Sequence, residues 1–173
     1  MNFIRLVLIF CLLCSCFASE SFAFQNPAES IRWGQSIQEL RHSGQFSSYI
    51  EGDSKSLFTN RDTHSLLVDT SILNTKANIL YTFDDGKLRD FVVHINDVHN
   101  KDTLYEEMLN HIANRYETYQ GEMFSGFDER FTDKDKTTLI VMAKGNGIFI
   151  YCLDYRYHEQ YRESQTQPFM TTR

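Results

Sequence analysis

Three side chains near the middle of the chain are of types that could carry out catalysis. His94, Asp97 and His99 lie close together in sequence, and imidazoles with a carboxylate can bind zinc or transfer protons. An expected strand ends beside His94, so Asp97 and His99 fall in the loop that follows. At a strand end and in a loop, this spacing does not hold the two imidazoles on the same side of the backbone, whereas an i,i+4 spacing places them on one face of a helix. A small periplasmic hydrolase that uses these three residues, with or without a metal, is the alternative hypothesis, and a solvated loop explains the same residues.

Asp84, Asp85 and Cys152 are weaker catalytic candidates. Adjacent carboxylates can serve acid–base chemistry, but Asp84 and Asp85 precede Gly86 between two expected strands, where aspartate is favoured in tight turns. Cys152 lies in an apolar, strand-like run, where a free thiol behaves as a small apolar side chain. We therefore assign no catalytic residue, no metal ligand and no cofactor.

A group of tyrosines near the C-terminal end is the strongest candidate for a binding site. Tyr151, Tyr155 and Tyr157 share one parity along an expected last strand, and Arg156 lies beside them. Tyrosine and arginine are enriched at the energetic centres of protein interfaces. The pattern predicts a contact surface made of Tyr151, Tyr155, Arg156 and Tyr157. The edge of a core, with the hydroxyls reaching water, is the other interpretation.

Hairpins are expected to position these residues. Apolar residues recur at every second position in 77–83 and in 87–95, and Asp85-Gly86 between them permits the positive φ angles of a tight turn. A last hairpin is expected from 137–143 and 148–157, which are rich in β-branched and aromatic residues.

Three further strands are expected earlier in the chain. They cover 46–51, 55–59 and 64–70, with Gly52-Asp53 as the turn between the first two. The polar segment 125–136 is expected to be a loop.

Two helices are expected, each introduced by a capping box. Ser36 and Glu39 begin a short helix that ends near Gly44. Thr103 and Glu106 begin a longer one, with apolar residues at helical spacing. Tight hairpins leave no room for crossover connections. The predicted fold class is therefore α+β: an antiparallel β-sheet built from hairpins, with two helices packed on one face.

The N-terminus predicts export. Residues 1–23 combine a basic start, a short apolar run and small residues before the expected cut, which is typical of a signal peptide. Residues 24–173 are then a single α+β domain. Cys16 offers a second interpretation, because the residues before it resemble a degenerate lipobox, in which case the protein is a structural envelope lipoprotein acylated at Cys16.

Composition narrows the function classes. The net charge is −6, which argues against nucleic acid as a partner because phosphate backbones are bound by clustered basic residues. After residue 23, no apolar run approaches the length needed to span a bilayer, so no transmembrane segment is expected. Only Cys152 would remain in the exported chain, which rules out an intrachain disulfide there.

Two short motifs resemble small exported bacterial envelope proteins. Trp33-Gly34 precedes the serine-capped helix, and residues 79–88 form the hairpin that follows. This arrangement is similar to β-lactamase-inhibitor-like and BamE-like α+β domains, a resemblance that implies binding or scaffolding. We expect a non-catalytic binding or envelope-associated protein, periplasmic or secreted or else tethered through Cys16, whose partner is another envelope or exported protein.

Overall fold

A computed structural model of the chain describes residues 31–43, 48–96 and 99–166. The expected signal peptide 1–23, including Cys16, and Asp97 of the histidine segment lie outside the described residues. Export and acylation therefore stay predictions. None of the helices in the described part is long and apolar enough to cross a membrane.

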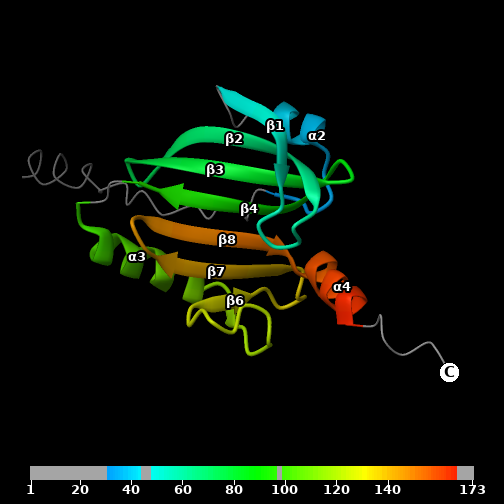
Figure 1. The fold of residues 1–173 in the computed structure, drawn as a ribbon. Coiled ribbons are helices and arrows are strands. Elements are labelled where there is room, and N and C mark those ends of the chain that lie inside the picture. The colour runs from blue at the N-terminus through cyan, green and yellow to red at the C-terminus, as the bar shows by residue number, and fades with distance from the viewer. Residues whose placement is uncertain (1–30, 44–47, 97–98, 167–173) are drawn as a thin grey trace, which may run out of the picture.

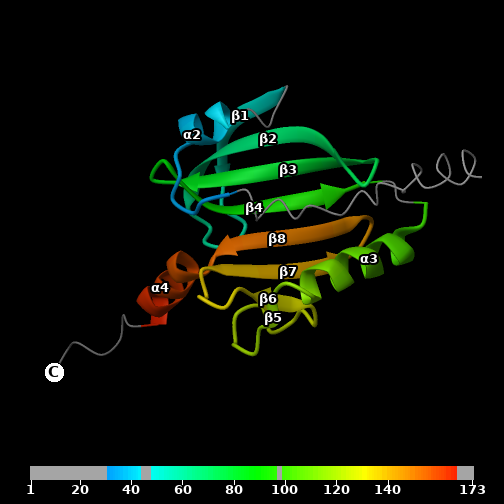
Figure 2. The ribbon, with the colours of Figure 1, turned by 180° about the vertical axis from the view of Figure 1, so that it is seen from behind.

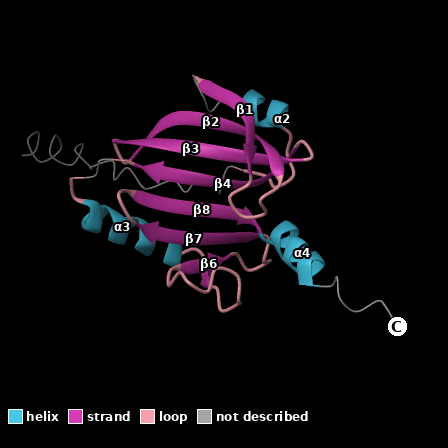
Figure 3. Cartoon of the chain, in the orientation of Figure 1, coloured by secondary structure: helices cyan, strands magenta, loops and turns pink. Residues whose placement is uncertain are grey.

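The described strands form one eight-stranded antiparallel sheet, and three described helices accompany it (Figure 1, Figure 3). An α+β fold with an antiparallel sheet is what the sequence predicted. The strands are β1 Tyr49–Lys55, β2 Asp62–Ile72, β3 Thr75–Asp84, β4 Lys87–Ile95, β5 Glu117–Thr118, β6 Arg130–Thr132, β7 Thr138–Lys144 and β8 Ile148–Asp154. The helices are α2 Ile37–His42, α3 Lys101–Ala113 and α4 Tyr155–Thr166.

The chain is arranged as two similar halves. Each half is a helix followed by four antiparallel strands, α2 before β1–β4 and α3 before β5–β8. The spatial order β1-β2-β3-β4-β8-β7-β6-β5 shows that the last strands of the two halves pair at the centre. The edge strands of the sheet are therefore β1 and β5, and β5 is only two residues long.

The hairpin of β3 and β4 is confirmed and has a two-residue turn. Asp85 and Gly86 have φ angles of 51° and 69°. Both angles lie in the left-handed region that a type I′ turn requires and that Asp-Gly tolerates. The segment before α2 is joined to this hairpin, because Gly34 donates to the Leu88 carbonyl (3.0 Å) and Leu88 donates to the Gln35 carbonyl (2.9 Å).

The helix starts were predicted with mixed success. The capping box of Ser36 and Glu39 is present at α2. The helix α3 is present as well, but it begins at Lys101 with Asn100 as its N-cap, and Thr103 lies inside it. Thr103 therefore does not act as the cap that the sequence suggested.

Three elements differ from the prediction. Gly52 and Asp53 lie inside the continuous strand β1, so there is no turn there and no separate strand at 55–59. The expected loop 125–136 contains the short strand β6. The last strand stops at Asp154, and the next residues form α4, which makes three described helices in place of the expected two.

Alternation along the strands divides the buried apolar residues between the two faces of the sheet. The larger cluster combines one face of the strands, including Tyr81, Phe91 and Ile150, with Leu40 of α2 and Met108 of α3. A smaller cluster lies on the other face, toward β7 and β8. Figure 2 shows α3 lying across β7 on the face that is turned away in Figure 1.

Candidate binding surface

The four predicted contact residues lie on two different elements. Tyr151 is in β8, whereas Tyr155, Arg156 and Tyr157 form the first turn of α4. Asp154 stops the strand and begins the helix, since its Oδ1 accepts from the Tyr157 amide at 3.2 Å. The alternation argument is therefore wrong after residue 154, and these side chains do not share one strand face.

Tyr155 is a core residue rather than a contact residue. Its side chain is 9% exposed and belongs to the smaller cluster. Its hydroxyl donates to Glu159 at 2.8 Å, and its ring meets Tyr119 edge-on with centroids 5.8 Å apart. For this residue, the core interpretation describes the structure.

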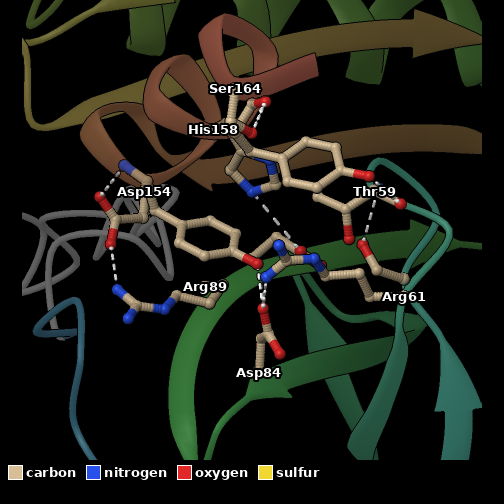
Figure 4. A network of polar contacts seen from close by, with 11 residues as sticks. Thr59, Arg61, Asp84, Arg89, Asp154, His158 and Ser164 are labelled. Carbon is tan, nitrogen blue, oxygen red and sulfur yellow. Dashed lines mark hydrogen bonds and ion pairs between the residues drawn. The ribbon is translucent and has the colours of Figure 1, made fainter. Parts of the chain in front are cut away.

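Tyr157 fixes α4 to the β3–β4 turn. Figure 4 shows the polar network around Asp84, with Arg61 and Arg89 nearby. The Tyr157 hydroxyl donates to Asp84, which also accepts from Arg61 Nη1 at 3.2 Å. Burial and the hydrogen bond to Asp84 raise the pKa of Tyr157 to about 12. The Arg89 guanidinium lies 4.4 Å from the centre of the Tyr157 ring.

A buried contact between a histidine and an aspartate lies beside this network. His158 of α4 is 5% exposed and Asp90 of β4 is 1% exposed, with His158 Nε2 3.6 Å from Asp90 Oδ2. The His158 ring also contacts Phe58 edge-on at 5.7 Å. Together with Tyr161, which donates to the Thr59 carbonyl at 2.7 Å, these contacts fix α4 against the β1–β2 connection.

An apolar row crosses the sheet on the face opposite α3. Cross-strand pairing connects one residue from each of six adjacent strands into a continuous line. The members, from the edge inward, are Ile50, Leu67, Leu80, Val92, Tyr151 and Val141. Ile50 is 70% exposed, Leu67 and Leu80 are half-buried, and none of the three belongs to a core cluster, whereas Val92 and Val141 are buried. We call this row and the aromatic residues around Tyr151 the open face.

Aromatic rings form the inner end of the open face. Tyr151 meets Phe58 edge-on at 5.8 Å and lies nearly parallel to Phe149, with centroids 6.1 Å apart. Phe127 lies 6.2 Å from the Tyr151 ring and is 37% exposed. Tyr151 is thus the one predicted contact residue on this surface.

Arg156 and Tyr157 line a separate open depression of about 710 Å³. Its other lining residues are Ile31, Arg32, Trp33, Arg89, Tyr116, Asp133, Thr137, Thr138, Asp154 and Gln160. We call it the Trp33 groove. The indole of Trp33 stacks on Phe91 at 5.9 Å and donates to Thr138 Oγ1 at 2.8 Å, so this wall of the groove is fixed.

His94 and His99, the two described residues of the candidate catalytic group, do not form a common site. His94 stacks on Phe149 with centroids 4.2 Å apart and an interplanar angle of 7°, beside the open face. His99 is exposed and lines a polar depression with Asn78 and Asn96. Within the described ranges, no three His, Cys, Asp or Glu side chains are placed to hold a metal ion.

Consecutive apolar residues in three strands are a sequence signal for the open face. Three strands carry consecutive apolar residues, at 66–68, 79–81 and 91–93, where a strand with one solvated face would alternate. Such runs indicate that both faces of the strand are apolar.

The comparison with protein-family models, curated proteins and solved structures finds no match for this chain.

Proposed function

We propose that this is an exported, non-catalytic binding protein that contacts another exported or envelope protein through the open face. The observation that carries the proposal is the outer part of the apolar row, where Ile50 is exposed and Leu67 and Leu80 are half-buried on three adjacent strands. Exposed apolar patches on a sheet mark interaction surfaces, since burying them releases about 25 cal/mol per Å².

The inner end of the row supplies anchoring side chains. Tyr151 and Phe127 offer large rings that are only partly buried, and aromatic residues contribute strongly to interface energies. The open face has no arginine or lysine in its row, so it suits an apolar segment of a partner better than an anionic one.

The placement of the helices supports the same proposal. Leu40 of α2 shares a cluster with Met108 and Ile112 of α3, which favours two helices on one face. In the described part of the chain, α4 covers the inner end of the opposite face through Tyr155 and His158, and the outer end of the row around Ile50 lies outside both core clusters. The resemblance to small exported envelope domains is a further reason to expect a protein partner.

Residues 1–23 are the basis for proposing export, and acylation at Cys16 is the tethered form of the same proposal. The intact mass of the protein from membrane and soluble fractions distinguishes the two, because acylation adds lipid to a chain beginning at Cys16.

The binding role is tested by charging the open face. We expect Leu67→Glu and Leu80→Glu to lower capture of the partner from envelope extract about 10-fold, because a carboxylate in an apolar contact is poorly solvated. Asn110→Glu, on the exposed side of α3, adds the same charge elsewhere and is the matched control. Equal capture of the partner by the wild type and the three variants, with unchanged melting temperatures, would contradict the proposal.

A further inference from the structure

The Trp33 groove is a second surface, distinct from the open face. It is formed by the segment before α2, the residues before β7 and the first turns of α4. Its volume of about 710 Å³ falls within the range of small-molecule sites, about 300–1,000 Å³.

Both carboxylates of the groove already have partners. Asp154 accepts from Arg89 Nη1 at 3.0 Å and from the Tyr157 amide at 3.2 Å. Asp133 accepts from the amides of Thr137 and Thr138 at 2.6 and 2.9 Å. Asp154 is thus paired with Arg89, and the lining of the groove contains three arginines against these two aspartates.

Two arginines of the groove are not neutralised in this way. Arg32 and Arg156 are exposed, and neither guanidinium has a hydrogen bond or ion pair to another residue in the described part of the chain. Arg32 acts on Glu39 only through charge at longer range. A protein with a net charge of −6 thus has an open groove in which positive charge is in excess.

We propose that the Trp33 groove binds a small ligand that bears a carboxylate or phosphate, held by Arg32 and Arg156. A guanidinium offers parallel N–H donors that match the oxygens of either anion. The rings of Trp33 and Tyr157 supply apolar walls, and Arg89 holds the Tyr157 ring in place. This site is independent of the proposed protein contact on the open face.

Trp33 makes the proposal directly measurable, because it is the only tryptophan in the chain. Citrate and inorganic phosphate are titrated into the full chain at constant ionic strength while tryptophan emission is recorded, with sodium chloride as the blank. We expect a saturable change in emission with at least one of the two anions. Saturation by citrate alone assigns a carboxylate ligand, and saturation by phosphate alone assigns a phosphate.

Variants show whether the arginines hold the anion. Arg32→Gln and Arg156→Gln each weaken binding about 10-fold, as expected for the loss of a charge-assisted hydrogen bond. Arg156→Lys keeps the charge but loses the paired donors, so its affinity for the anion should lie between those of the wild type and Arg156→Gln. Arg162→Gln is the matched control, since Arg162 lies on the same helix, pairs with Glu122 at 3.3 Å and does not line the groove.

Two results would overturn the inference. One is a response to both anions that does not saturate or does not exceed the chloride blank. The other is equal weakening by Arg162→Gln and Arg156→Gln, which would show a general effect of surface charge. Far-UV circular dichroism on each variant confirms that the fold is retained.

Discussion

Asp84 connects three parts of the chain through one carboxylate. It ends β3, accepts from Tyr157 of α4 and accepts from Arg61, the residue before β2. Burial alone would raise its pKa, but the hydrogen bonds from Tyr157 and Arg61 outweigh burial and hold the pKa of Asp84 below its ordinary value of 3.8. The folded chain therefore favours the charged form of Asp84.

This shift predicts how stability depends on pH. The contribution of Asp84 is fully present above about pH 4 and is lost as the pH falls through its lower folded-state pKa. Asp84→Asn should lower the free energy of unfolding by about 1.5 kcal/mol at neutral pH, because a hydrogen bond to a charged group is lost. Below about pH 4 the difference between wild type and variant should shrink, measured by urea unfolding across the pH range.

Asp85→Asn is the control for this measurement. Asp85 is the next residue in the same turn, its side chain is exposed, and asparagine tolerates its φ of 51°. The free energy of unfolding of Asp85→Asn should equal that of the wild type at each pH. A constant gap between wild type and Asp84→Asn down to the lowest pH would show that the charge of Asp84 does not stabilise the fold.

The four residues that the sequence analysis proposed as contacts differ in their accessibility. Tyr151 and Arg156 are accessible, whereas Tyr155 is buried and Tyr157 holds α4 in place. Residue type alone could not separate these cases, because tyrosine serves both cores and interfaces. The arginines of the Trp33 groove are far apart in sequence, so only the fold brings Arg32 and Arg156 to one groove.

At the scale of elements, local patterns predicted the strands that obey simple rules. The β3–β4 hairpin was predicted because its apolar residues alternate and Asp85-Gly86 fits its turn. The edge strand β1 was divided wrongly, since Gly52-Asp53 is a turn sequence and nearly all of this strand is exposed. Aromatic residues at 155–157 suggested a strand, although Asp154 is a helix N-cap residue.

The turn between β3 and β4 gives a prediction at this scale. Gly86 has a φ of 69° and no atom within 4 Å of an added Cβ, so Gly86→Ala should cost about 1 kcal/mol through backbone strain alone. Gly126 has equally open surroundings without a positive φ, so Gly126→Ala should change stability by less than about 0.5 kcal/mol. Urea unfolding of both variants checks this difference, and equal values would show that turn geometry does not limit stability.

At the scale of the whole molecule, the open face exists only because the two halves join. The row begins in β1 to β4 of the first half and continues through β8 to β7 of the second. The apolar runs in single strands indicate that both faces of these strands are apolar. No local sequence pattern, however, specifies the order in which the strands pair. The antiparallel α+β class could be predicted from the sequence, whereas this continuous apolar row could not.

The central claim, that the open face contacts another exported protein, is tested most directly by photo-crosslinking in intact cells. A photoreactive side chain is placed at Leu80 on the open face or at Asn110 on α3. The proposal predicts an adduct of defined mass with one exported or envelope protein from position 80 and none from position 110. No adduct from position 80, or the same adduct from both positions, would contradict it.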